Sequence, residues 1–236
     1  MGTAMATITD GLSGDSLVRL MTWLSPAYPV GGYAYSHGLE YAVECQLVRD
    51  EASLVRWIEG IIAFGAGRMD GVFFAEAWRA VANGDETALA EVAERAAVLR
   101  GTAELALESS QQGAAFLKTL RDTAPSEALA RFANAVPMHA YPTAVAIAAA
   151  ISDIPLRPAL LAYLHAFAAN LVLAGVRLIP LGQLAGQRTI ENLRPTVVAT
   201  VDAALKHRTT DIGSAAAMID WTSMKHETQY TRLFRS

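Results

Sequence analysis

The stretch DETALAEVAERAAVLRGTAELALESSQQGAAFLKTLR, residues 85–121, shows most clearly which secondary structure this chain forms. Its apolar and small residues recur at alternating steps of three and four, the spacing of one face of an α-helix. The residues of this face, large at both ends and small in the middle, are Leu89, Val92, Ala96, Leu99, Ala103, Ala106, Ser110, Gly113, Leu117 and Leu120. Because small residues let a second backbone come close, we expect another helix to cross between Ala103 and Gly113.

The same period recurs along the rest of the chain. In residues 50–68 the apolar side chains share one helical face, and Asp50 is placed to cap its start. Prolines and an Asn-Gly pair divide the chain into segments whose lengths suit helices. The sequence contains no hairpin signal, that is, no pair of strand-like runs of alternating β-branched residues joined by a short turn. No linker rich in glycine, serine or proline divides the sequence. The sequence predicts an all-α fold, a single-domain multi-helix bundle over residues 1–236, with flexible termini at residues 1–12 and 227–236.

The composition excludes several classes of protein. Residues of the set AVILMFWYC make up 53%, charged residues 18%, and the net charge is −4 with a pI of about 5.7. Such a chain is too apolar to be disordered, and it lacks the basic excess that nucleic-acid binding requires. The one cysteine, Cys45, cannot form an internal disulfide, and the N-terminus shows no secretion signal. We therefore expect a cytoplasmic protein.

Residues 159–176, ALLAYLHAFAANLVLAGV, are the most apolar stretch of the chain. Their number approaches the roughly 20 residues that a membrane-spanning helix requires. However, His165 and Asn170 interrupt the stretch, and Arg177 and Pro180 close it, which would be costly in lipid. We therefore favour a central core helix, apolar all round, in which His165 is hydrogen-bonded in the interior.

Sequence motifs of catalysis and metal binding are largely missing. There is no phosphate-binding loop, dinucleotide motif or zinc motif, and the five histidines never pair at metal-ligand spacing, so we expect no metal and no cofactor. Residues 34–38, Ala-Tyr-Ser-His-Gly, match a nucleophile elbow with alanine at its first glycine, which gives a serine hydrolase using Ser36 as the alternative function. Two prolines stand where an elbow needs a central strand, so we favour Ser36 as the cap of a helix over residues 36–46.

Three segments are unusual for a helical core. Residues 25–40 carry three tyrosines, three glycines and two prolines, and residues 230–236 combine arginines with aromatic residues. In residues 177–188, Gly182 and Gly186 are four apart, as are Gln183 and Gln187, so we expect each pair to share one face of a helix. Tyrosine and arginine are enriched at protein interfaces, and glycine permits close helix contact. The alternatives are a packed loop, internal helix packing beside Pro180, and a frayed terminus.

The same segments resemble a known family. Residues 24–40, LSPAYPVGGYAYSHGLE, are similar to the opening motif of the UreF urease accessory proteins, and residues 180–187, PLGQLAGQ, are similar to that family's P-L-G-Q-x-x-G-Q motif. Residues 104–113 and the ending RLFRS also resemble the family, but more weakly. Two long motifs in the expected order make the resemblance specific.

The resemblance implies an all-α, usually dimeric protein without catalytic activity. Its implied partners are UreD (also called UreH), the GTPase UreG and, through them, apo-urease, which receives nickel. A role in regulating GTP hydrolysis is also implied, for which Arg188 or Arg232 could act in trans. Which segment meets which partner, and whether nickel contacts His37, Cys45 or any other residue of this chain, stays open. The candidate partner-binding residues are Tyr33, Tyr35, Ser36, His37, Glu40, Gly182, Gln183, Gly186, Gln187, Arg188, Arg232, Leu233, Phe234 and Arg235.

Overall fold

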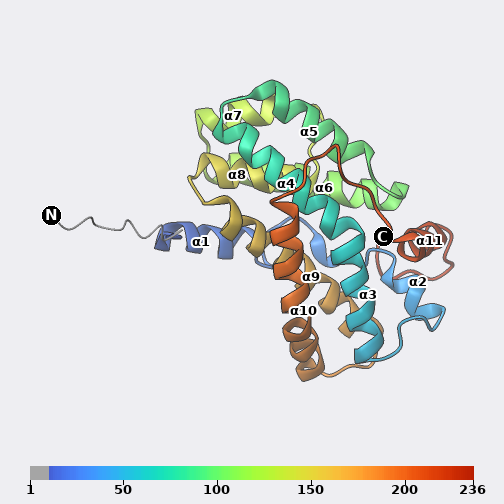
Figure 1. Ribbon diagram of the computed structural model, residues 1–236. Coiled ribbons are helices and arrows are strands. Elements are labelled where there is room, and N and C mark those ends of the chain that lie inside the picture. The colour runs from blue at the N-terminus through green and yellow to red at the C-terminus, as the bar shows by residue number, and fades with distance from the viewer. Residues whose placement is uncertain (1–10) are drawn as a thin grey trace.

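The computed structural model describes residues 11–236, and all regular secondary structure within them is helical (Figure 1). The elements are α1 (Gly14–Trp23), the short 3-10 helix η1 (Gly32–Ala34), α2 (Leu39–Glu44), α3 (Glu51–Phe64), α4 (Ala66–Ala82), α5 (Glu86–Val98), α6 (Ala103–Thr123), α7 (Glu127–Asn134), α8 (Tyr141–Ile151), α9 (Leu156–Leu178), α10 (Gln183–Ala204) and α11 (Ala217–His226). The all-α prediction is confirmed. Of the N-terminal segment that we expected to be flexible, residues 1–10 lie outside the described residues.

The centre of the core is built on α4 and α8. Helix α4 packs against α3, α5, α8, α9 and α10, and its Phe73 and Phe74 are fully buried. Helix α8 is buried continuously from Pro142 to Ala150, and most of these residues are alanine, valine or isoleucine. A helix that is apolar all round belongs inside a protein, and its small side chains let α4 and α6 come close on its two sides.

Residues 85–121 form two helices, although their periodicity continues across the break. Helix α5 ends at Val98, and α6 starts after Thr102, whose hydroxyl accepts the free backbone N–H of Leu105 in the first turn of the new helix. Between them, the guanidinium of Arg100 reaches back into the core and donates to the buried carboxylate of Asp70 at 2.6 Å. This buried ion pair holds the connection between α5 and α6 against α4.

The predicted close approach within residues 103–113 is confirmed, with one change. A Cβ on Gly113 would lie 1.9 Å from the carbonyl oxygen of His139, so only glycine fits there. The segment that approaches is the turn leading into α8, and Tyr141 at the start of that helix donates its N–H to the hydroxyl of Ser109. Close contact therefore occurs at a helix start and does not require two helices to cross at mid-length.

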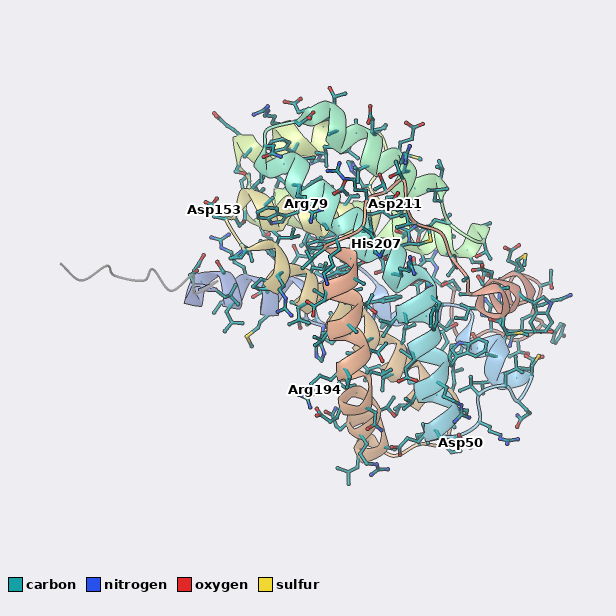
Figure 2. All side chains as sticks on the ribbon, viewed as in Figure 1. Asp50, Arg79, Asp153, Arg194, His207 and Asp211 are labelled. Atoms are coloured by element: carbon teal, nitrogen blue, oxygen red, sulfur yellow. The ribbon has the colours of Figure 1, made fainter. Side chains whose placement is uncertain are left out.

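Residues 50–68 also divide into two helices. Asp50 caps α3 as predicted, and its carboxylate accepts the N–H of Ser53 at 2.8 Å in a capping box (Figure 2). The chain then turns at Gly65, and α4 begins one residue later. A Cβ on Gly67 would lie 2.6 Å from the backbone of Ile62, so glycine lets α4 start tightly against the end of α3.

Helix α9 contains the apolar stretch 159–176. By length and composition it is the one helix of the described residues that could cross a bilayer, and half of its most apolar window is buried within the protein. The prediction of a central core helix holds for one side of α9 only, because the other side faces an open cavity. His165 lies on that side and is exposed, so its predicted interior position was wrong.

Candidate partner-binding site

The last residues of the chain, the C-terminal segment 230–236, lie against the loop before α2. Leu233 and Phe234 donate their backbone N–H groups to the carboxylate of Glu40 at 2.7 and 2.9 Å. Arg235 donates its N–H to the carbonyl of Ala34 at 2.7 Å. Figure 1 shows this end of the chain beside α2 and α11. The region that we expected to be flexible is thus placed by several backbone hydrogen bonds.

Phe234 anchors the segment to the body of the protein. Its side chain is only 3% exposed, and the guanidinium of Arg177 lies 4.3 Å from the centre of its ring, a cation–π contact. Arg177, at the end of α9, also donates to the carbonyl of Tyr33 at 2.6 Å. One arginine therefore joins α9, the loop before α2 and the C-terminal segment.

Beneath this segment lies a buried carboxylate cluster, formed by Glu40, Glu104 and Glu108. His226 of α11 is fully buried between the first two: Nε2 lies 3.0 Å from Glu40 Oε2, and Nδ1 lies 2.8 Å from Glu104 Oε2. Arg232 donates to the other oxygen of Glu104 at 3.1 Å. Burial raises the pKa of Glu104, while His226 and Arg232 act against this rise.

The third carboxylate, Glu108, holds the end of the segment. It accepts the hydroxyl of Ser236 at 2.9 Å, and the Nδ1 atom of His37 lies 3.4 Å from the same oxygen, at ion-pair distance. Glu104, Glu108 and Gln112 are spaced by four along α6, so they share one face. Our sequence reasoning left these residues and His226 out of the site. Polar residues at this spacing, beside the small residues of the same helix, were the available signal.

Local backbone geometry presents this loop to the segment. His37 and Gly38 both have left-handed backbone angles, with φ of 58° and 75°, so the chain reverses sharply before α2. A Cβ on Gly38 would lie 2.8 Å from the backbone nitrogen of Ser223, so only glycine allows α11 to pack here. For His37 the left-handed conformation costs about 1 kcal/mol, offset by burial of its ring against Phe167 at 5.5 Å.

Ser36 is fully buried and takes part in this packing. Its hydroxyl donates to the carbonyl of Ser236 at 2.6 Å and accepts the N–H of Glu40 at 3.3 Å. The predicted helix over residues 36–46 was too long, because α2 begins at Leu39. The serine hydrolase alternative is not supported, since this hydroxyl is inaccessible and its neighbour His37 faces Glu108.

Tyr35, beside Ser36, is another buried support of the loop. Its hydroxyl donates to the side-chain oxygen of Gln111 on α6 at 2.7 Å. Burial raises the pKa of Tyr35, so the phenol stays protonated and keeps this hydrogen bond at neutral pH.

The structure brings nine of the candidate residues together. Five of them are buried and support the others: Tyr35, Ser36, His37, Glu40 and Phe234. The other four are exposed and, together with Tyr230, form what we call the tail surface, which consists of Tyr33, Tyr230, Arg232, Leu233 and Arg235. Tyr33 is 70% exposed and Leu233 60%, unusually high values for large apolar side chains.

The remaining five candidates lie at the start of α10. Gly182 precedes the helix, so it does not share a helix face with Gly186, as we had predicted; only Gly186 is buried, against Val176. The side chains of Gln183 and Gln187 are exposed.

Arg188 forms a bidentate salt bridge with Glu51 at the start of α10. Its guanidinium donates to both carboxylate oxygens of Glu51, at 3.1 and 2.6 Å, and it lowers the pKa of that carboxyl. This charge is therefore already paired within the chain.

Within residues 11–236, no group of three or more histidine, cysteine, aspartate or glutamate side chains is arranged to hold a metal ion. In the carboxylate cluster, the ring nitrogens of His226 and the carboxylate oxygens already contact each other and the C-terminal segment.

Comparisons with known proteins agree with the motifs. The family model UreF matches residues 48–194. The urease accessory protein UreF of Rhodopseudomonas palustris (strain HaA2) is 50% identical over 224 residues, 94% of each chain. Proteins of the same name from Granulibacter bethesdensis and Bradyrhizobium diazoefficiens are 48% and 44% identical, and the matches span 97% and 94% of this chain and 97% and 92% of theirs. The chain therefore belongs to the UreF family of urease accessory proteins.

Proposed function

We propose that this chain is a non-catalytic scaffold of urease maturation, which bridges UreD (also called UreH) and the GTPase UreG so that nickel is inserted into apo-urease in the cytoplasm. Its family membership supports a role in urease maturation. The observation that carries the proposal is the tail surface. This surface combines the loop before α2 with the C-terminal segment, and both resemble motifs of the family. A hydrogen bond from Ser36 to Ser236, 200 residues apart in sequence, connects the two segments.

The tail surface has the composition and the support that a partner-binding site requires. Tyrosine and arginine dominate binding hot spots, and side chains already held in position lose less entropy on binding. Here the exposed Leu233 lies between Arg232, which is paired with Glu104, and the buried Phe234. The partner would therefore meet a surface that this chain has already ordered.

A regulatory effect on UreG would use the same surface. Arg188 and Arg232, the arginines that could act in trans, are both engaged in ion pairs with Glu51 and Glu104. Arg235 is exposed, and within the described residues its side chain forms no ion pair. Arg235 is therefore the best placed of the three to reach another protein.

Co-purification tests the scaffold proposal. Leu233→Asp should reduce recovery of co-expressed UreD and UreG at least ~10-fold, because a charge replaces an exposed apolar contact. Leu184→Asp, at the exposed start of α10, tests the other candidate segment, and Met138→Asp, an exposed apolar residue between α7 and α8, is the control. Unchanged recovery and unchanged urease activation with Leu233→Asp would contradict the proposal.

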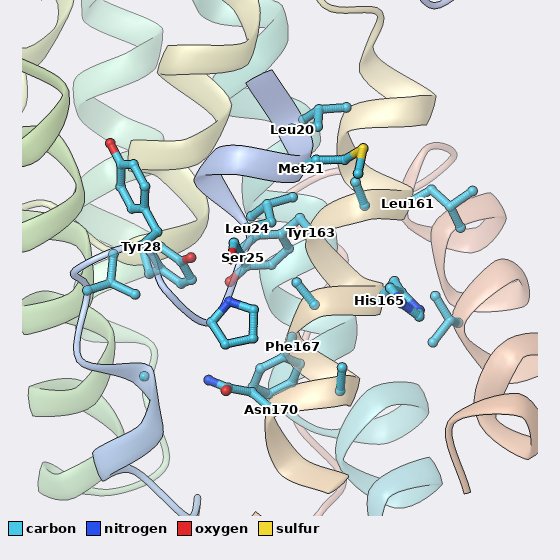
Figure 3. A pocket seen from close by; sticks show the side chains of 18 of the residues that line it. Leu20, Met21, Leu24, Ser25, Tyr28, Leu161, Tyr163, His165, Phe167 and Asn170 are labelled. Atoms are coloured by element: carbon cyan, nitrogen blue, oxygen red, sulfur yellow. The ribbon is translucent and has the colours of Figure 1, made fainter. Parts of the chain in front are cut away.

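We infer that the chain also forms a homodimer, through the apolar side of α1 and α9. Leu17, Val18 and Met21 of α1 are exposed, and α1 borders a cavity of about 670 Å³ that α9 and α10 also line (Figure 3). An exposed apolar helix beside an apolar cavity is self-complementary, which a two-fold symmetric pair requires. A second copy would bring its own α1 to this cavity.

A further inference from the structure

Helix α11, at the right in Figure 1, has its polarity reversed relative to an ordinary surface helix. Three of its four buried side chains are polar, namely Thr222, Ser223 and His226. Its outward face carries three large apolar side chains that are 53, 38 and 50% exposed, namely Met218, Trp221 and Met224. A surface helix normally turns its apolar side chains toward the core, so this arrangement requires an explanation.

The polar contacts of the buried face fix this orientation. The hydroxyl of Ser223 lies 2.7 Å from the hydroxyl of Thr102 at the start of α6. The ring of His226 lies between Glu40 of α2 and Glu104 of α6. Turning the helix to bury its methionines would separate these buried polar groups from their partners, which is costly. The apolar side chains of α11 therefore stay exposed in the single chain.

The exposed side chains form one continuous apolar line. Met218, Trp221 and Met224 follow one another at steps of three, so they are neighbours along one side of the helix. The ring of Tyr41 on α2 lies 5.6 Å from the ring of Trp221 and widens the line. We call these four residues the α11 face. Methionine and aromatic residues are enriched in the cores of protein interfaces, which favours contact with another protein.

The charges around the α11 face are mainly negative. Among the exposed and half-exposed charged side chains of α2, α11 and residues 227–229, three are carboxylates, namely Glu44, Asp220 and Glu227, and one is the ammonium group of Lys225. The carbonyl groups at the end of α11 add to the negative potential there. A binding partner with positive charges around its apolar side chains is therefore favoured, and an anionic lipid surface is disfavoured.

We propose that the α11 face docks an amphipathic helix of another protein. The apolar side of that helix covers Met218, Trp221 and Met224, and lysine or arginine side chains beside it meet the carboxylates of Glu44 and Glu227. A helix fits because the line of apolar side chains is straight and follows the axis of α11. The α11 face shares no residue with the tail surface, so one chain can hold a different partner on each.

Binding of a synthetic helix to the full-length protein tests this chemistry. The probe has leucine on one side and lysine on the other, and its counterpart has glutamate in place of lysine. Fluorescence anisotropy of the labelled peptides gives both dissociation constants. The lysine peptide should bind at least ~10-fold more tightly, and high salt should reduce the difference by screening the charges. Equal affinity of the two peptides would overturn the proposal.

Substitutions without a change of charge locate the binding site of the lysine peptide. Trp221→Ser removes the central apolar side chain and should weaken binding at least ~10-fold. Met218→Gln should also weaken binding, and it keeps the contact between Trp221 and Tyr41 in case the first variant disturbs the fold. Met138→Gln, at an exposed position between α7 and α8, is the control and should bind like the wild type. Unchanged binding by both α11 variants would contradict the assignment.

Hydroxyl-radical footprinting extends the test to natural partners, because exposed methionine oxidises readily. In a purified complex with UreD and UreG, Met218 and Met224 should oxidise several-fold more slowly than in the free chain, while Met138 stays unchanged. A complex in which all three react as in the free chain would overturn the proposal. Protection that grows with the concentration of the free chain would assign the face to a second copy and overturn it as well. If no complex forms, the scaffold proposal fails, and the peptide measurements decide this one.

Discussion

The two sides of this molecule handle polarity in opposite ways. Around the C-terminal segment, the protein buries Glu40, Glu104 and His226 and gives each of them partners from its own chain. Around α1, which lies at the left in Figure 1, away from the C-terminus at the right, it leaves Leu17 and Met21 exposed beside an apolar cavity. On the first side the buried polar groups have their partners within one chain, whereas the second side has an apolar helix face beside a cavity that another molecule can cover.

Residue type alone does not separate these two sides. Phe234 and Met21 are both large apolar residues near an end of the chain, yet one is 3% exposed and the other 66%. The ring of Phe234 contacts the guanidinium of Arg177, and its backbone N–H donates to the carboxylate of Glu40. Met21, in contrast, projects from α1, which packs against few other elements. The predictions below test this contrast, beginning with the largest effect.

Removing the central carboxylate should have the largest effect. Glu40→Ala leaves the Nε2 atom of His226 and two backbone N–H groups without their carboxylate partner, so we expect the free energy of unfolding to fall by about 3–5 kcal/mol. Urea denaturation measures the change. Glu91→Ala, an exposed glutamate on α5, is the control and should change the value by less than about 0.5 kcal/mol. Similar losses in both variants would show that the cluster does not stabilise the fold.

Adjacent residues of the C-terminal segment should separate stability from binding. Phe234→Ala should lower the free energy of unfolding by about 2–3 kcal/mol, less than in a central core because a terminal segment can detach. Leu233→Ala should change it by less than about 0.5 kcal/mol but should weaken partner recovery. Denaturation and co-purification of the same two proteins check both statements, and equal destabilisation by both variants would contradict them.

A charge on the α1 side should affect association and leave the fold unchanged. Met21→Glu should weaken the proposed homodimer at least ~10-fold, because a charge would be buried between the copies. Light scattering over a dilution series measures the monomer fraction, and Val98→Glu on α5 provides an equally exposed control. A dimer that persists with Met21→Glu would place the contact elsewhere.

The surface ion pair of α10 should give the smallest effect. Arg188 lowers the pKa of Glu51, so the pair stabilises the folded state above the ordinary pKa of glutamate and loses this effect as the pH falls through the lowered value. The melting temperature of Arg188→Ala should therefore lie slightly below that of the wild type at neutral pH, and the difference should shrink as the pH is lowered below the ordinary pKa of glutamate. A difference that persists in acid would have another cause.

The helices could be predicted from the sequence, but their ends could not. The spacing of apolar residues in 85–121 and 50–68 is helical throughout, yet both stretches are interrupted. Arg100, in the interruption between α5 and α6, forms a buried ion pair with Asp70, which is 30 residues away in sequence. The spacing of apolar residues shows which side chains share a helix face, but it cannot show contacts between residues that are distant in sequence.

The candidate site could also be predicted only in part. Residues 33–40 and 232–235 were recognised from composition and from the family resemblance, and the structure brings them together. Neither source could show that five of these residues are buried supports, or that His226 lies between Glu40 and Glu104. The Glu40–His226 contact joins residues 186 apart in sequence.

By itself, the sequence determined that this chain is helical, that it belongs with the UreF proteins and that its unusual segments are residues 25–40, 177–188 and 230–236. These are properties of local spacing and residue type. Only the tertiary structure decided which polar residues are buried, which apolar residues stay exposed and which segments meet. Burial and charge pairing depend on neighbours in space, and packing brings those neighbours from distant parts of the chain.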